Sequence, residues 1–334
     1  MNKVPIFIKW HSFMVFMFFL NHVYAETFTD LFEVTISTDS EAYSNLDENA
    51  LIEIALDILL LRITGRDDLR LIANYDSLRP YQNLVLQRGY IENERYLVAF
   101  IEESIRTFLR ANNINFWGEE RPQIGLIAVS SEGRILQEAH FLDPSIEYFK
   151  DLNSMIEEDA YQRGIFINYI LTDNFSIKAN DILFFNFNIL QDIMESQDLD
   201  YLVLLNIQSL YFEDRFFWYL LDKNSGIRKI EANTLSDGIP NIASYLASIY
   251  AFPDYSENID ITVSGIRSME DYNRLRQRLR DLSIIENIQF RSLINDNVNL
   301  RIDVTGGADA FSKIITIENL FISSEDTLIF QNIP

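Results

Sequence analysis

The chain has 334 residues, of which 48% are hydrophobic and 13% aromatic, so its composition is that of a globular protein and excludes a disordered or collagen-like chain. Its 50 acidic residues outnumber the 27 lysines and arginines, and the resulting net charge of -23 opposes binding to nucleic acid or to an anionic membrane surface. The chain has no cysteine and three histidines, which excludes disulfides, thiolate nucleophiles and cysteine-based metal centres.

The first 25 residues have the three parts of a secretory signal. Lys3 and Lys9 supply positive charge, and residues 13–20 form an uninterrupted apolar run. Val23 and Ala25 then fit the small-residue rule of a cleavage site at its two outer positions. The run is far shorter than the roughly 20 residues that span a bilayer. We therefore expect residues 1–25 to be removed after export, leaving a mature chain without a transmembrane segment.

Residues 26–118 are predicted to form an N-terminal α+β unit. Apolar side chains recur at helical spacing in 47–62 and predict a helix there. Arg62 in its last turn complements the helix dipole, and Gly65 accepts a left-handed conformation after it. We interpret both residues as structural. The predicted elements are a strand at 31–36, the helix at 47–62, a hairpin of 84–90 with 95–101, and a helix at 104–111.

Residues 119–252 alternate strand and helix patterns, which predicts a central α/β unit with a mostly parallel sheet. Residues 124–129 are a continuous apolar run typical of a strand buried on both faces. Proline and polar residues interrupt the periodicity in 252–258, which is a predicted linker. The other predicted elements are a helix from Asp143-Pro144 to 161, a strand at 165–171, a helix at 190–196, a strand at 201–207, an antiparallel hairpin of 216–221 with 227–232, and a helix at 239–250.

Residues 258–334 are predicted to form a C-terminal unit with the order strand, helix, strand, strand, helix, strand. This βαββαβ order is that of a ferredoxin-like unit. Its predicted elements are a strand at 259–264, a helix at 268–282, a hairpin of 284–293 with 298–304, a helix at 308–315 and a strand at 327–330. The fold class expected for the whole chain is α+β with several units.

A series of short motifs follows along the chain. They are Leu61-Arg62-Ile63-Thr64-Gly65, Phe116-Trp117-Gly118-Glu119-Glu120-Arg121-Pro122, Arg163-Gly164-Ile165, Thr172-Asp173, Asp200-Tyr201-Leu202-Val203, Val263-Ser264-Gly265-Ile266 and Asp271-Tyr272. In their order and spacing these motifs resemble a family of exported bacterial proteins catalogued as DUF2066, a domain of unknown function. The resemblance implies an exported cell-envelope protein and supplies no catalytic residue. The central unit also resembles the amino-terminal domain of the translocation protein TolB, at the level of fold alone.

Within these motifs, Trp117 admits two interpretations. It could present an aromatic anchor to a partner. We favour a packing role at the junction of the first two units, with Arg121 stacking on or near the indole before Pro122.

The loops that follow the strands of a parallel sheet form the usual ligand crevice of such a unit. In this chain they span 130–143 and 172–181, and they contain no glycine-rich phosphate-binding sequence. No cofactor is therefore expected. A triad of Ser131, His140 and Asp143 is one alternative, and a solvated histidine is the other. The candidate polar residues of this crevice are Ser131, His140, Asp143, Thr172 and Asp173.

Neighbouring carboxylates at Glu157, Glu158 and Asp159 leave a second class of function open. Glycosidases use a pair of carboxylates as acid and base, so a hydrolase acting on an envelope polymer is the alternative prediction. An exposed helix of an acidic chain produces such runs as well. No metal is expected, because Asn295-Asp296-Asn297 lacks the longer oxygen series of a calcium loop.

The helix predicted at 268–282 carries the clearest local charge anomaly. Its arginines are Arg274, Arg276, Arg278 and Arg280. Arg274 and Arg278 are one turn apart and are predicted to share a face, which could contact an acidic partner or another unit of this acidic chain. A solvated helix face is the other interpretation, because Glu270 lies one turn before Arg274. The sequence thus predicts a periplasmic, non-enzymatic accessory or adaptor protein that binds another envelope protein and no nucleic acid.

Overall fold

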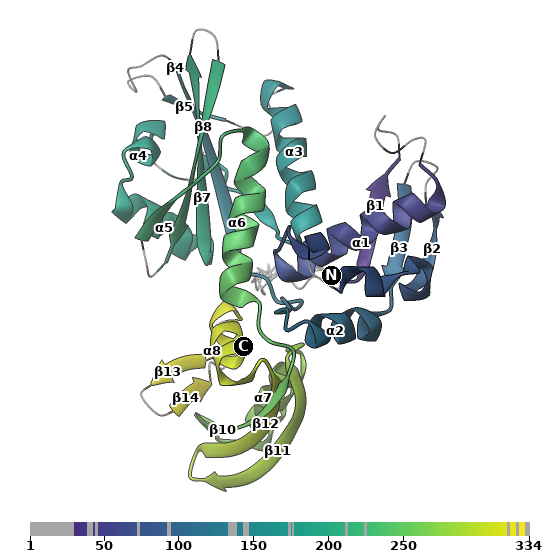
Figure 1. Ribbon diagram of the computed structural model, residues 1–334. Helices are drawn as coiled ribbons and strands as arrows, with labels where there is room; N and C mark the ends of the chain where they lie inside the picture. The colour runs from purple at the N-terminus through teal and green to yellow at the C-terminus, as the bar shows by residue number, and fades with distance from the viewer. Residues whose placement is uncertain are drawn as a thin grey trace, which may run out of the picture.

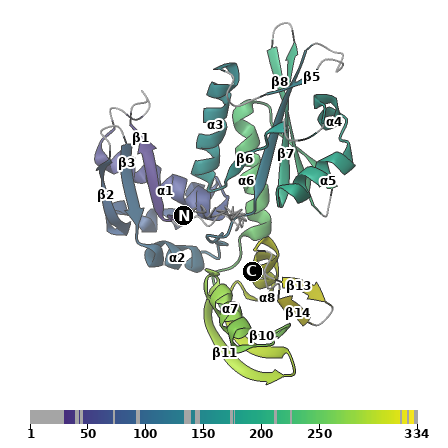
Figure 2. The same ribbon diagram turned by 180° about the vertical axis from the view of Figure 1, so that it is seen from behind.

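The computed structural model describes residues 30–38, 43, 46–71, 74–91, 95–132, 139–142, 147–172, 175, 177–210, 213–223, 226–318, 321–324 and 327–330. The predicted signal at 1–25 and the candidates Asp143 and Asp173 lie outside these residues. The described chain is a mixed α+β protein with three separate sheets (Figure 1). Figure 2 shows the same arrangement from behind, with the first and central sheets side by side and the third beyond the end of α6.

The N-terminal unit is a three-stranded antiparallel sheet in the order β1-β3-β2, with α1 packed against it. Its elements are β1 (Glu33–Ser37), α1 (Glu48–Thr64), three short 3-10 helices (Leu69–Leu71, Tyr75–Leu78 and Tyr81–Leu84), β2 (Val85–Ile91), β3 (Arg95–Phe100) and α2 (Glu102–Ala111). The ends of α1 follow from local chemistry. The carboxylate of Asp47 accepts a hydrogen bond from the Ala50 N–H at 2.8 Å, and Gly65 ends the helix in a left-handed conformation at φ 67°.

The central unit is a mixed sheet covered by helices on both faces. Its elements are β4 (Ile124–Glu132), β5 (Ala139–Phe141), α3 (Glu147–Arg163), β6 (Ile167–Tyr169), α4 (Ala179–Leu183), α5 (Phe187–Ser196), β7 (Tyr201–Leu210), β8 (Glu213–Asp222), β9 (Gly226–Ile230) and α6 (Leu235–Tyr250). One apolar cluster lies on the side of α3 and α6, and a second lies on the side of α4 and α5. This explains why residues 124–129 are apolar on both strand faces.

The prediction of a mostly parallel sheet is wrong for this unit. β4 runs parallel to β6 and β7, but β5 with β4, β7 with β8, and β8 with β9 are antiparallel pairs. Only two residues separate β7 from β8 in the sequence, and so short a connection joins antiparallel strands. The sequence pattern identified the strand at 216–221 but not that the strand begins at Glu213 and pairs along all of β7.

The start of α6 also differs from the prediction. The sequence pattern predicts a helix beginning at 239, but the helix begins at Leu235 and contains Pro240. The side chain of Asp237 accepts hydrogen bonds from the backbone N–H groups of Asn233 and Thr234, each at 2.9 Å. This capping fixes the helix start one turn earlier.

The C-terminal unit has a five-stranded sheet in the order β11-β12-β10-β14-β13. Its elements are β10 (Ser256–Ser264), α7 (Met269–Arg280), β11 (Ile285–Ile294), β12 (Asn297–Thr305), α8 (Gly307–Ile317), β13 (Phe321–Ser324) and β14 (Thr327–Phe330). Burial alternates along β12, with its apolar side chains facing the core that α7 and α8 complete. The predicted order of elements is present, with β13 as an additional strand.

The central and C-terminal units share one apolar core. The core cluster on the α6 side of the central sheet continues without a break through α7, α8 and β12. In Figure 1, α8 lies directly beyond the end of α6. The N-terminal unit has a core of its own. Among the described residues, none of the helices combines the length and the apolar character needed to cross a membrane.

Candidate functional site

Of the predicted crevice residues, the structure describes Ser131, His140 and Thr172, and it does not bring Ser131 and His140 together. Ser131 on β4 is paired with Ala139, and the neighbouring Ser130 is paired with His140 on β5. Because side chains alternate between the faces of a sheet, Ser131 and His140 point to opposite faces. The Ser131 hydroxyl is buried and donates to Asn206 Oδ1 at 3.3 Å, whereas His140 is exposed. Thr172 follows β6, whose pairing with β4 ends at Leu126.

The neighbouring carboxylates of α3 form part of an exposed helix surface. Glu157 accepts a hydrogen bond from Asn153 at 2.9 Å, and Glu158 accepts one from Gln162 at 2.8 Å. Each of these partners lies one turn away on the same helix. Burial raises the pKa of Asp159, which lies near Arg163. These contacts are those of a solvated helix face.

The two candidate arginines lie one turn apart on α7 and differ in exposure. Arg274 is exposed and donates to Asp271 Oδ1 at 2.8 Å within the same helix. Arg278 is half-buried, and its positive charge acts on the carboxylate of Glu318 at the end of α8. Arg278 thus lies near enough to Glu318 for its charge to act there, whereas Arg274 is exposed.

The motif residues meet where α1, the 116–122 segment and α6 converge. Trp117 is buried, and the guanidinium of Arg121 lies 3.8 Å from the centre of its ring. The ring of Tyr250 stacks on that of Trp117 at 6.2 Å, and the backbone N–H of Trp117 donates to the Ile63 carbonyl oxygen at 2.7 Å. Pro122 is buried beside them. This arrangement ties all three segments together.

Two buried arginines lie at the centre of this junction. Arg62 donates to the carbonyl oxygens of Leu31 at 3.3 Å and Glu33 at 2.6 Å, and Arg121 donates to those of Trp117 at 3.3 Å and Arg62 at 3.4 Å. Burial, and secondarily the like charge of Arg62, lower the pKa of Arg121 well below its ordinary value. Carbonyl oxygens and the aromatic rings of Tyr161 and Trp117 contact the two guanidinium groups.

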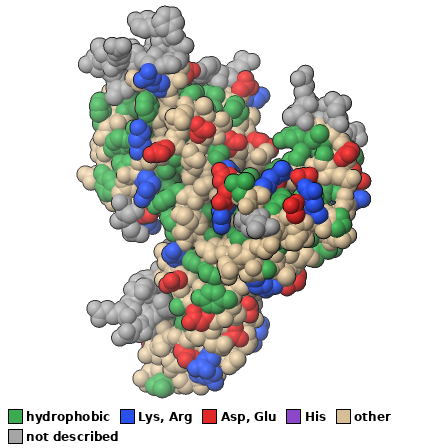
Figure 3. All heavy atoms as spheres, in the orientation of Figure 1, with side chains coloured by type: hydrophobic (Ala, Val, Ile, Leu, Met, Phe, Trp, Pro, Cys, Tyr) green, Lys and Arg blue, Asp and Glu red, His purple; other side chains and the backbone are tan. Residues whose placement is uncertain are grey.

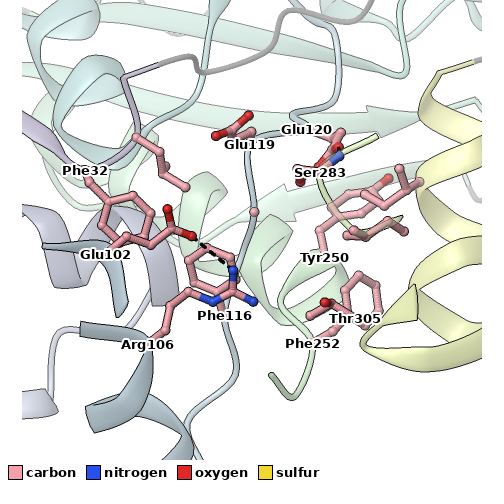
Figure 4. Close-up of a pocket in the computed structure, with 14 residues that line it drawn as sticks. Phe32, Glu102, Arg106, Phe116, Glu119, Glu120, Tyr250, Phe252, Ser283 and Thr305 are labelled. Atoms are coloured by element: carbon pink, nitrogen blue, oxygen red, sulfur yellow. Dashed lines mark hydrogen bonds and ion pairs between the residues drawn. The ribbon is translucent and has the colours of Figure 1, made fainter. Parts of the chain in front are cut away.

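A cavity of about 160 Å³ lies next to this junction, where all three units meet (Figure 4). We call it the junction cavity. Its walls come from the N-terminal unit, the 116–120 segment, the end of α6 and the C-terminal unit. Its lining residues are Leu31, Phe32, Glu102, Arg106, Phe116, Gly118, Glu119, Glu120, Tyr250, Phe252, Ser283, Ile284, Thr305 and Ile314.

Carboxylates form the polar part of the junction cavity. Glu120 is buried, and its two oxygens accept hydrogen bonds from the backbone N–H of Ser283 at 2.5 Å and from the Ser283 hydroxyl at 2.6 Å. Burial, together with the negative charges of Glu120 and Glu102, raises the pKa of Glu119. The segment 119–120 thus brings negative charge between aromatic walls.

Two further carboxylates near this junction have perturbed pKa values. Burial raises the pKa of Glu318 to about 7, and the negative charge of Glu120 adds to the effect. Burial likewise raises the pKa of Asp200 to about 6, although its hydrogen bond from the Gln123 N–H at 2.8 Å acts in the opposite direction. Both groups favour their neutral forms near the contact between the central and C-terminal units.

Sequence reasoning did not find the junction cavity. Its lining residues are scattered from Leu31 to Ile314 and belong to no single periodic segment. The one available signal was the pair Glu119-Glu120, which follows Trp117 in a family motif and to which the sequence pattern assigned no role. Comparisons with protein-family models, curated proteins and solved structures found no match for this chain.

Proposed function

We propose that this protein is a non-enzymatic accessory protein of the bacterial cell envelope that binds another envelope protein through its C-terminal unit. The observation that carries this proposal is an exposed apolar surface on α7 and β11. We call it the β11 surface and define it by Met269, Phe290 and Leu293, which are 68%, 53% and 50% exposed. Adjacent exposed apolar side chains of this kind mark interaction sites on proteins.

The strand register explains why these side chains are adjacent yet exposed. Phe290 pairs with Leu300 and Leu293 pairs with Val298, so all four lie on the face that α7 and α8 cover. β11 is at the edge of the sheet, where α7 covers this face only in part (Figure 2). The ring of Tyr272 on α7 meets Phe290 edge to face at 5.8 Å, which joins helix and strand into one surface.

Charge next to the β11 surface favours an acidic partner. Arg276 and Arg280 follow Tyr272 at one and two turns along the same side of α7. Within the described part of the chain, neither arginine has a carboxylate partner.

Figure 3 shows acidic and basic side chains intermingled over one face of the molecule, so the net charge of -23 is not gathered in a single patch there.

The proposal includes export to the periplasm and membership of the DUF2066 family, both of which rest on the sequence. A ferredoxin-like assignment of the C-terminal unit is supported by the order β11-β12-β10. The parallel pairing of β14 with β10 departs from it, because a strand that directly follows α8 should run parallel to β12 and antiparallel to β10. β13 has that direction, and β14 is its hairpin partner. The TolB-like assignment of the central unit is a proposal of the same kind.

Crosslinking followed by affinity capture from the cell envelope tests this function. The variant with both Phe290→Ser and Leu293→Ser should recover the specific partner at least tenfold less than the wild type, because it removes apolar contact area. The control variant, with Leu86→Ser and Tyr90→Ser, alters two exposed apolar side chains of β2 in the N-terminal unit. It should recover the same partner as fully as the wild type does. Equal recovery by the two variants, with both folded by circular dichroism, would contradict the proposal.

A further inference from the structure

The junction cavity has the size of a single side chain or a small organic molecule. Its volume is about 160 Å³, and an apolar protein cavity of about 150 Å³ holds one benzene molecule. A ligand of about five to seven heavy atoms therefore fits. Larger drug-like or nucleotide ligands occupy pockets of about 300 to 1,000 Å³ and are excluded by size.

Aromatic rings form two opposite walls of the junction cavity. Phe32 and Phe116 stack on each other at 6.2 Å on the side of the N-terminal unit. Tyr250 and Phe252 lie on the other side, next to the C-terminal unit (Figure 4). These walls suit an apolar stem. The faces of aromatic rings attract cations, and Phe116 and Phe252 already have Arg106 at 5.0 Å and Lys313 at 5.3 Å over their rings.

Most charged groups in the walls already have partners. Arg106 donates to Glu102 Oε1 at 3.0 Å and also binds the buried carboxylate of Asp254. Both oxygens of Glu120 accept hydrogen bonds from Ser283. The positive charge in the wall is thus neutralised within the protein.

Glu119 is different from these groups. No hydrogen bond or ion pair joins its half-buried carboxylate to another described residue. The positive charge that acts on this carboxylate is that of Arg121. Arg121 is itself buried behind the wall and donates its hydrogen bonds to carbonyl oxygens. The carboxylates of Glu102 and Glu120 add negative potential at the same place. An anionic ligand would meet repulsion here, whereas a cation would relieve it.

We propose that the junction cavity binds an organic cation, a primary ammonium or guanidinium group on a short apolar stem, with its charge next to Glu119 and its stem between the aromatic walls. Two sources offer this chemistry. One is a free small amine, and the other is a lysine or arginine side chain of a bound protein. The site lies on a different part of the molecule from the β11 surface and does not depend on it.

Isothermal titration calorimetry of the wild-type protein tests this site with four probes. n-Butylammonium and N-acetyl-lysine-N-methylamide represent the free amine and the protein side chain. n-Butanol and butyrate are the neutral and anionic counterparts of the first probe. We expect at least one cationic probe to bind at least tenfold more tightly than n-butanol, with no binding of butyrate. The cationic probe that binds more tightly identifies the source.

The Glu119→Gln variant keeps the shape of the side chain and removes its charge. Its affinity for the cationic probe should therefore be at least tenfold lower than that of the wild type. Glu195→Gln, an exposed position on α5, is the matched control and should bind as the wild type does. Binding of neither cation, equal binding of n-butanol, or unchanged binding by a folded Glu119→Gln variant would overturn the proposal.

Discussion

At the scale of single residues, two glycines determine how closely the first two units approach each other. A Cβ atom on Gly65 would lie 2.1 Å from the Cβ of Ala247 on α6, and one on Gly164 would lie 2.5 Å from the Cγ of Arg62. Both residues also have positive φ. The absence of a side chain at these positions therefore allows α1 to contact α6 and α3.

Replacement of Gly65 by alanine tests this contact. The added methyl group meets Ala247 while the backbone holds a left-handed conformation, so the variant should lose about 3 kcal/mol of unfolding free energy. Gly226→Ala is the control, because Gly226 also has positive φ but has open space around its Cα, and it should lose about 1 kcal/mol. Denaturant unfolding measures both losses. Equal losses would show that the contact between α1 and α6 is not tight.

At the scale of elements, the connection between α6 and β10 is a fixed junction as well as a linker. Phe252 exchanges two backbone hydrogen bonds with Phe116, at 2.7 and 2.9 Å. The side chain of Asp254 is only 3% exposed and binds Arg106 of α2, with Arg110 at 3.7 Å. The strand β10 already begins at Ser256. The predicted linker 252–258 is thus tied to the N-terminal unit by a buried charge.

We expect Asp254→Asn to release this segment. Removing one partner of a buried ion pair leaves Arg106 with weaker compensation and should cost about 2 kcal/mol. Limited proteolysis between 252 and 258 should then be about 30-fold faster than in the wild type, since local opening becomes easier by that amount. Asp260→Asn removes an exposed partner of Arg301 and should change the rate little. Equal cleavage rates for the two variants would mean that the junction is not held by Asp254.

At the scale of the whole molecule, a strongly acidic chain places poorly solvated carboxylates at the contact between its central and C-terminal units. Burial raises the pKa of Glu318 to about 7 and that of Asp200 to about 6, compared with about 4 in an unfolded chain. Between about pH 4 and pH 7 the native state therefore binds more protons than the unfolded state. The free energy of unfolding must therefore fall as the pH rises through this window.

Thermal unfolding as a function of pH tests this expectation. The midpoint temperature of unfolding should decrease as the pH is raised from about 4 to about 7. The double variant Glu318→Gln with Asp200→Asn should show a flatter profile, with a higher midpoint temperature than the wild type at pH 8. Glu195→Gln should keep the wild-type profile. A wild-type midpoint that rises through this range would contradict the assigned shifts, as would a slope that the double variant does not change.

The amino-acid sequence by itself determined most of the local structure. The cap at Asp47, the stop at Gly65 and the alternation along 298–304 act within a few residues, so their effects are visible without any tertiary contact. The same holds for the apolar run at 124–129, which requires burial on both faces. These signals predict most of the helices and strands and their order, whereas the short elements β5, α4 and β13 are not predicted by them.

Only the tertiary structure decided how these elements combine. The long β7–β8 hairpin makes the central sheet mixed, and the register of β5 turns His140 away from Ser131. The packing of α7 within its unit brings the charge of Arg278 near Glu318. The junction cavity brings together Phe32, Glu119 and Thr305 from segments far apart in the chain. Such contacts depend on long-range packing, in which each position is fixed by residues that no local pattern connects to it.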